Sequence, residues 1–216
     1  DAMTQCAFRL VTGASHALQG QIARRDLDIA ICAAGTSDPA GSLTHPLIDD
    51  PYILAVPTGT DVSRGLGGLA GLTFLRRDPD QVMGQQIERY LASSGLNLPH
   101  RFEMDSNQSI SALVAGGTGW TITTPLSLLR AGRFEGGIDA HPLPGAPMSR
   151  RIVLYATDDW TGPIPAQIAA RARDLIEDRF AEPGRARMPW LGDSFQVQRS
   201  AQSEASGVTN PNAGPF

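Results

Sequence analysis

The sequence contains no lysine, few cysteines and no long apolar run. All 18 basic residues are arginine, and they never cluster beyond adjacent pairs such as Arg76/Arg77 and Arg150/Arg151. Binding to a phosphate backbone needs a concentrated basic face, so this distribution argues against DNA binding by the chain itself. No apolar run approaches the roughly 20 residues that cross a bilayer, and no membrane partner is predicted.

The sparse cysteines and histidines also exclude several kinds of site. Cys6 and Cys32 are too few for a disulfide framework and match no metal-binding spacing, so we predict reduced thiols in a cytoplasmic protein, with a disulfide as the alternative. The four histidines are scattered, with none at the i, i+4 spacing of a metal site. No G-x-S-x-G elbow is present. We therefore predict no metal, no cofactor and no catalytic residue.

Composition is that of an ordinary globular protein. The 216 residues are 41% hydrophobic and 19% charged, with a net charge of −4. This length suits one large domain or two small lobes.

Hydrophobic patterning predicts alternating strands and helices, and hence α/β layers with mainly parallel strands. Ser15 is placed to be the N-cap of the first helix, and the apolar run 27–33 is typical of a strand covered on both faces. The tail 199–216 is predicted to be disordered, whereas 188–195 is expected to dock onto the body and cover Trp190. The predicted strands are 7–12, 27–33, a short extended 43–47, 52–56, 73–75, about 102–104, 120–124, 138–143 and 152–156. The predicted helices are 15–25, 81–94, one that begins within 105–109 and ends at Gly116 and Gly117, and 166–180.

The stretch 100–125, HRFEMDSNQSISALVAGGTGWTITTP, holds the main chemical candidates. Asp105, Ser106, Asn107 and Ser109 crowd the start of its helix. The first N–H groups of a helix have no internal partner and carry partial positive charge, so such a start can cradle a carboxylate or phosphate. The alternative is a plain N-cap, which Ser or Asn supplies at most helix starts.

Two other stretches are weaker candidates. GLGGLAG (65–71) lacks the G-x-G-x-x-G spacing after a strand, so we interpret it as a connection. Asp158 and Asp159 beside Trp160 fit a solvated loop better than an acid/base pair.

Three motifs in order resemble the effector-binding domain of LysR-type transcriptional regulators. They are FRLVTGASHALQGQIARRDLDIAI (8–31), HPLIDDPYILAVP (45–57) and SISALVAGGTGWTITTP (109–125), and the resemblance spans about residues 7–180. It implies a type 2 periplasmic-binding-protein-like α/β fold of two lobes joined by two crossover strands. The first lobe would comprise 1–57 plus 152–182 and the second 58–151, followed by a largely disordered extension, 183–216.

The resemblance also implies a function. A small effector, expected to be anionic, would bind between the lobes, and the domains would pair into a homodimer or tetramer. The family's polar helix starts match Ser15 in one lobe and Asp105, Ser106, Asn107 and Ser109 in the other. His16 beside Ser15, Pro57 in the second motif and Thr123 in the third complete the predicted effector-binding set. Asp105 would repel an anion, so a ligand that also bears an amine or hydroxyl would suit it better.

Two departures from the family accompany the resemblance. The family's domain usually begins with another strand and helix before 7–12, and its DNA-binding winged helix-turn-helix is not in this chain. DNA binding is therefore expected only through a separate N-terminal part. The alternatives are a solute-binding protein of a transporter and, ranked lower, an enzyme on the same scaffold.

Overall fold

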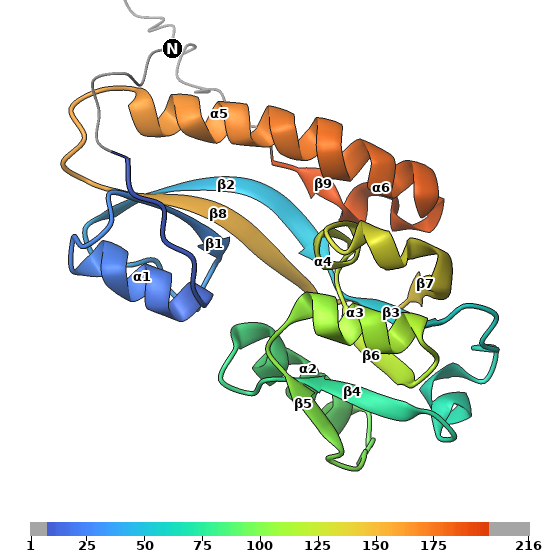
Figure 1. The fold of residues 1–216 in the computed structure, drawn as a ribbon. Helices are drawn as coiled ribbons and strands as arrows, with labels where there is room; N and C mark the ends of the chain where they lie inside the picture. The colour runs from blue at the N-terminus through green and yellow to red at the C-terminus, as the bar shows by residue number, and fades with distance from the viewer. Residues whose placement is uncertain (1–7, 199–216) are drawn as a thin grey trace, which may run out of the picture.

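The computed structural model describes residues 8–198, which form two β-sheets with helices on both faces of each (Figure 1). The first sheet has the order β1-β8-β2-β9 and the second β5-β4-β6-β3-β7. None of the helices in this part of the chain is long and apolar enough to cross a membrane.

The strands and helices have the following bounds. The strands are β1 (Ile29–Ala33), β2 (Ser42–Pro51), β3 (Ile53–Pro57), β4 (Thr73–Arg77), β5 (Phe102–Met104), β6 (Gly119–Thr123), β7 (Ile138–Pro142), β8 (Ser149–Thr157) and β9 (Gln196–Val197). The α-helices are α1 (Ser15–Ala23), α2 (Val82–Ser93), α3 (Asn107–Ala115), α4 (Pro125–Leu129), α5 (Ile164–Ile176) and α6 (Glu182–Arg187). Short 3-10 or π turns are η1 (Gly65–Leu69), η2 (Gly132–Gly137), η3 (Glu177–Ala181) and η4 (Pro189–Ser194).

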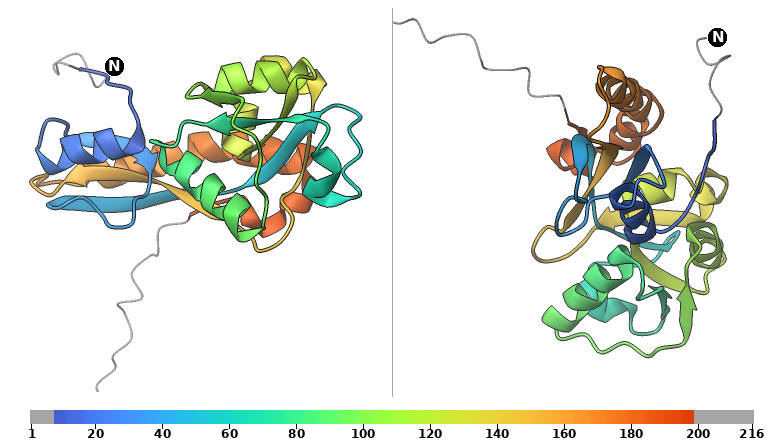
Figure 2. Two further views of the ribbon diagram at one scale, coloured as in Figure 1. Left: turned by 90° about the horizontal axis from the view of Figure 1, so that it is seen from below. Right: turned by 90° about the vertical axis from the view of Figure 1, so that its left-hand side faces the viewer.

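Helices α1 and α5 cover opposite faces of the first sheet (Figures 1 and 2). Leu18 and Ile22 of α1 pack with Val153 and Tyr155 of β8. The alternate β8 residues Leu154 and Ala156 pack instead with Ala169 of α5. Successive side chains of a strand point to opposite faces, so β8 forms the middle of this three-layer unit.

The second sheet is likewise enclosed between two helices. Phe74 and Trp120 pack with Ile87 of α2 on one face. Leu75 packs with Ile110 and Val114 of α3 on the other. Gly119 allows β4 and β6 to approach closely, since a Cβ at this position would lie 2.0 Å from the Thr73 carbonyl oxygen.

The chain passes between the sheets twice. It leaves β2 of the first sheet at Pro51 and enters β3, which pairs with β6 and β7 of the second sheet. It returns from β7 through 143–148 into β8 of the first sheet. β3 lies within the predicted first-lobe range 1–57, although its strand partners belong to the second sheet.

The prediction of mainly parallel strands is wrong. Among the described strands, only the pairings of β4 with β5 and with β6 are parallel. Strand β8 runs antiparallel to both β1 and β2. The return from β7 brings β8 into the sheet between β1 and β2, strands far earlier in the sequence, and local patterns do not encode such a pairing.

The prediction of a strand at 7–12 is also wrong, as far as residues 8–12 are described. These residues form no strand, and Phe8 and Leu10 are exposed. β1 is consequently an edge strand of the first sheet. It is also not covered on both faces, because Ile31 is 48% exposed. In contrast, the short extended segment expected at 43–47 is part of the long strand β2.

The long C-terminal helix α5 packs on the first sheet through Ala169, Ala172 and Ile176. Ala169 is buried, whereas Ile168 and Leu175 are exposed. The chain then continues through η3 into α6, so the extension expected from residue 183 is folded as far as Gln198. The tail 199–216, for which disorder was predicted, and Cys6 lie outside the described residues.

The segment 188–195 docks onto the body as expected, but not through Trp190. Met188, Leu191 and Phe195 are buried, while Trp190 is 41% exposed. Phe195 packs in the same apolar cluster as Ile48 of β2 and Leu128 of α4. This segment therefore contacts both sides of the crossing between the sheets.

Candidate functional site

A cavity of about 500 Å³ lies between the α1 side of the first sheet and the α3–α4 side of the second. This volume falls in the range typical of small-molecule sites. Three of the predicted effector-binding residues line it, namely Ser15, Asp105 and Asn107.

The other predicted residues lie outside the lining. Thr123 is buried behind it and accepts a hydrogen bond from Arg77. His16 is exposed on α1, and Pro57 ends β3 opposite Ile138. Ser106 and Ser109 belong to the start of α3, where the Ser106 hydroxyl accepts a hydrogen bond from the Ser109 amide. The effector-binding role of all eight residues stays a prediction.

Ser15 does not cap α1. The helix begins at Ser15 itself, with Ala14 as N-cap and no side-chain cap hydrogen bond. The Ser15 Oγ instead accepts a hydrogen bond of 3.2 Å from the Ala33 amide. This contact ties the start of α1 to the end of β1 and places the hydroxyl at the cavity wall.

Three arginines that were not predicted line the cavity: Arg77, Arg130 and Arg150. The only acidic residue among the described residues that line it is Asp105. The side of the cavity formed by the second sheet and α4 is therefore strongly positive.

Arg77, at the end of β4, is only 5% exposed. Its Nη2 donates to Asn107 Oδ1 and, over 3.3 Å, to Thr123 Oγ1. Its Nε has no hydrogen-bond partner among the described residues, and no carboxylate there forms an ion pair with it. Burial, together with the nearby positive charge of Arg150, lowers the pKa of Arg77 to about 10. The group remains protonated at neutral pH, as a buried cation without a counter-charge.

Arg150, near the start of β8, is held by a buried carboxylate. Its Nε donates to Asp50 Oδ2 over 2.9 Å, and its Nη2 forms an ion pair with the same oxygen at 2.8 Å. Nη2 also lies 3.1 Å from Thr124 Oγ1 and 3.4 Å from Ser127 Oγ. No hydrogen bond within the described part of the chain involves Nη1, so this nitrogen is available to a ligand.

The opposite side of the cavity is mostly apolar. Leu18, Ile31 and Ile152 line it from α1, β1 and β8. Cys32 also lines it, and burial raises the pKa of its thiol, which disfavours the reactive thiolate. The cavity is thus basic on one wall and apolar on the other.

The arginines were missed because nothing local marks them. Arg77 and Arg150 are members of adjacent arginine pairs, and Arg130 follows directly after α4. In a strand, neighbouring side chains point to opposite faces, so the partners of a pair have separate environments. Arg76 pairs with Glu88 and Arg151 with Asp49, whereas Arg77 and Arg150 face the cavity.

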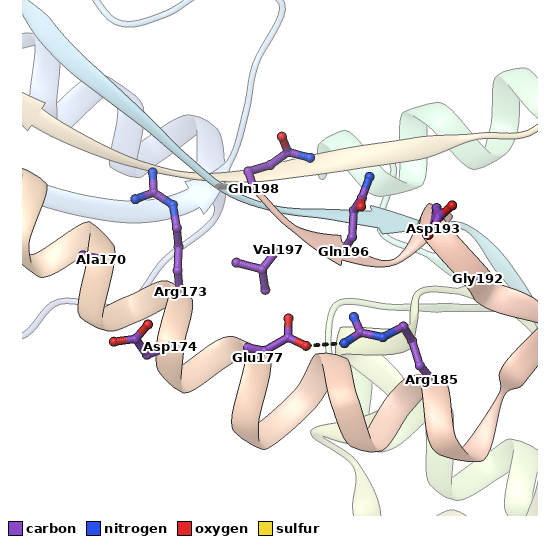
Figure 3. Close-up of a pocket in the computed structure, with 10 residues that line it drawn as sticks. All are labelled: Ala170, Arg173, Asp174, Glu177, Arg185, Gly192, Asp193, Gln196, Val197 and Gln198. Carbon is purple, nitrogen blue, oxygen red and sulfur yellow. Dashed lines mark hydrogen bonds and ion pairs between the residues drawn. The ribbon is translucent and has the colours of Figure 1, made fainter. Parts of the chain in front are cut away.

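A second cavity, of about 650 Å³, lies between α5, α6 and β9 (Figure 3). Its side chains largely satisfy one another: Glu177 and Arg185 point toward each other and form an ion pair, and Arg173 donates to the Pro46 carbonyl. It is lined by none of the predicted effector-binding residues. Across the described residues, no cluster of His, Cys, Asp and Glu side chains is placed to hold a metal ion.

Comparison with known proteins places these features in a family. The model of the LysR substrate binding domain matches residues 2–166. No curated protein sequence matches the chain closely enough to count as a relative.

Several solved structures share the fold. The CcmR regulatory domain of Synechocystis PCC6803, in complex with 2-PG, has 15% sequence identity and a TM-score of 0.61, covering 75% of this chain and 79% of that one. The effector-binding domain of QuiR, in complex with shikimate, has 14% identity and a TM-score of 0.59, covering 78% and 80%. A reduced form of OxyR from N. meningitidis has 22% identity and a TM-score of 0.58, covering 86% and 81%. These likenesses confirm the predicted α/β fold of the type 2 periplasmic-binding-protein kind.

Proposed function

Because the chain belongs to the LysR substrate-binding domain family, whose members are parts of transcriptional regulators, we propose that it senses a small anionic metabolite. The metabolite would bind in the cavity between the two sheets. The observation that carries this proposal is Arg77, a buried cation in the cavity with no carboxylate partner among the described residues. Burying an unpaired charge is costly, and an anionic ligand would remove that cost.

The two walls narrow the chemical class of the ligand. Arg77 and Arg150 suit a carboxylate or phosphate, since guanidinium N–H groups bind both strongly. Leu18 and Ile31 suit an apolar body. Two of the similar domains were solved with small ligands, 2-PG and shikimate. We therefore propose a small organic acid, and a hydroxyl or amine on it would suit Asp105.

The mode of action follows from the two-lobed arrangement. We propose lobe I as residues 1–57 plus 152–182 and lobe II as 58–151, with β3 as one crossover strand. A ligand that contacts both walls binds the closed arrangement more tightly than the open one and shifts the population toward it. The cavity would bind its ligand without turning it over, and DNA binding would belong to a separate N-terminal part of the regulator.

Self-association is the remaining part of the proposal. The exposed side chains of Ile164, Ile168 and Leu175 form an apolar strip along α5, which supports an interface between copies of the domain. Sedimentation velocity over a range of concentrations would measure it. A monomer at all concentrations would contradict this part and leave the ligand site unaffected.

Isothermal titration calorimetry with benzoate, shikimate, 2-PG and inorganic phosphate tests the ligand site. We expect at least one of these anions to bind, and Arg77→Gln to weaken its binding at least about tenfold, since a charge-assisted hydrogen bond contributes about 1.5–3 kcal/mol. Benzyl alcohol, which keeps the ring of benzoate but lacks its charge, should not bind detectably.

Arg151→Gln is the matched control. Arg151 lies next to Arg150, but it pairs with Asp49 outside the cavity and is half exposed. The variant removes the same charge and should leave anion affinity within about twofold, because exposed charges are screened by solvent and salt. Equal losses in both variants, or no anion binding to the wild type, would overturn the proposed function.

A further inference from the structure

Asp50 and Arg150 lie opposite each other where the chain passes between the two sheets. Asp50 is the penultimate residue of β2, just before the chain enters β3, and Arg150 is the second residue of β8, just after it returns. The two are register partners in the antiparallel pairing of β2 with β8. One ion pair therefore joins both crossings.

The Asp50 carboxylate also binds a third element. Its Oδ2 accepts from Arg150, while its Oδ1 accepts a hydrogen bond of 3.1 Å from the Leu126 amide in the first turn of α4. Helix α4 follows β6 and carries Ser127, with Arg130 directly after it. A single carboxylate thus fixes the start of β8 relative to α4.

Asp50 itself does not touch the cavity. Its exposed fraction is 0%, and it is absent from the cavity lining, whereas Arg150, Ser127 and Arg130 belong to that lining. Because Asp50 holds Nε and Nη2 of Arg150, it restricts the orientation of the guanidinium of this cavity-lining residue.

We propose that Asp50 is a positioning residue of the anion site, which orients Arg150 toward the ligand. The inference rests on the proposed function, since it requires an anion in the cavity. Asp50 keeps the guanidinium in one orientation in the free protein, so less of that ordering has to occur when the ligand binds.

The direction in which anion affinity changes when Asp50 is replaced distinguishes the positioning role from a purely electrostatic effect. Asp50 is a negative charge close to an anion site, so its removal alone would strengthen anion binding by removing a repulsion. Loss of orientation at Arg150 would weaken binding instead. A change from Asp to Asn keeps the size of the side chain and one acceptor oxygen, and it removes the charge that holds Arg150.

The test is calorimetric titration of the wild type, Asp50→Asn and the control Asp49→Asn with benzoate and with inorganic phosphate. Asp49 is the neighbouring aspartate and pairs with Arg151 away from the cavity. We expect Asp50→Asn to weaken binding about tenfold, the usual scale for loss of a group that orients a binding residue. Asp49→Asn should leave affinity unchanged or slightly raised.

A double mutant shows whether Asp50 acts through Arg150. In an Arg150→Gln background, the further change Asp50→Asn should alter affinity by less than about twofold, because the residue that it positions is gone. A full tenfold effect in that background would overturn the proposal. So would unchanged or tighter binding in the single mutant Asp50→Asn.

Thr124→Val covers the case in which Asp50→Asn does not fold. It removes a hydroxyl that accepts from Arg150 Nη2 and leaves every charge in place. Weaker binding supports the positioning of Arg150, and unchanged binding overturns it. If neither anion binds the wild type, the proposed function and this inference fall together; if the wild type binds and only the Asp50 and Thr124 variants disagree with expectation, the inference alone fails.

Discussion

At the scale of single residues, His45 is partly buried, and one of its two ring nitrogens has no hydrogen-bond partner among the described residues. It lies on β2 opposite Leu154, and the nitrogen concerned is Nε2. Burial, and to a lesser degree the positive charge of Arg173, lowers the pKa of His45 below its usual value of 6.5. The folded protein therefore disfavours the imidazolium that the unfolded chain accommodates freely.

This shift makes stability depend on pH. Between the usual pKa and the lowered one, the unfolded chain binds more protons than the folded protein, so the free energy of unfolding falls as the pH decreases below about 6.5. We expect His45→Phe, which keeps a ring but cannot titrate, to reduce this loss. Urea unfolding at pH 7 and about pH 5 would measure it.

His100→Asn is the control for the loss of an imidazole, since His100 is exposed in the loop before β5. Parallel pH dependence in the wild type and His45→Phe would show that His45 does not titrate as described. Because His45 lies in β2 and does not line the cavity, this result does not test the proposed ligand site.

At the scale of secondary structure, the start of α3 combines capping with a position at the ligand site. Ser106 is the N-cap, and its neighbours Asp105 and Asn107 line the cavity. The N-cap considered from the sequence is therefore Ser106, whereas the ligand cradle at this turn stays a prediction.

Ser106→Ala separates these two roles. We expect a loss of about 1 kcal/mol in the free energy of unfolding, as for other N-cap serines, with benzoate affinity within about twofold of the wild type. Ser109→Ala is the matched control, because Ser109 is exposed and its amide, not its side chain, makes the cap hydrogen bond. A tenfold loss of affinity in Ser106→Ala would assign its hydroxyl to the ligand instead.

Local elements were largely predictable from the sequence, whereas their pairing was not. The predicted helix 81–94 is α2, in which Met83, Ile87 and Leu91 are buried on one face, and Gly95 with φ of 68° follows its end. A segment forms a β-strand only if it has a neighbouring strand to pair with, in addition to a suitable hydrophobic pattern. Residues 8–12 have the pattern but form no ladder, and β8 pairs with β1 across more than a hundred residues of sequence.

The site was predictable only in part for a related reason. Hydroxyl-rich helix starts are visible in sequence, and these led to Ser15, Asp105 and Asn107. The arginines gain their importance from burial and from the absence of a carboxylate near Arg77 in the described part of the chain, which are properties of the assembled fold. In sequence, Arg77 is indistinguishable from Arg76, which forms an ion pair with Glu88 on the other side of the strand.

At the scale of the whole molecule, one apolar cluster restricts how the two sheets move relative to each other. Ile48 of β2, Leu128 of α4 and Phe195 of the C-terminal segment pack together at the crossing. Gly184 allows α6 to pack closely against Phe195, since a Cβ at this position would lie 2.7 Å from the Phe195 ring. Close-packed cores resist deformation, so this cluster is the expected pivot.

Closure of the cavity should therefore be a rotation about the crossing that brings α1 toward α3. A ligand that contacts Ser15 on one side and Arg77 on the other favours the closed arrangement only through its higher affinity for it. We expect saturating benzoate or inorganic phosphate to lower the radius of gyration measured by small-angle X-ray scattering. Arg77→Gln at the same concentration should show a smaller decrease, because it binds the anion more weakly, and Arg151→Gln should behave like the wild type. A ligand that binds by calorimetry without changing the scattering would mean that the two sheets already have their closed arrangement in the free protein, with the cavity preformed and the pivot rigid.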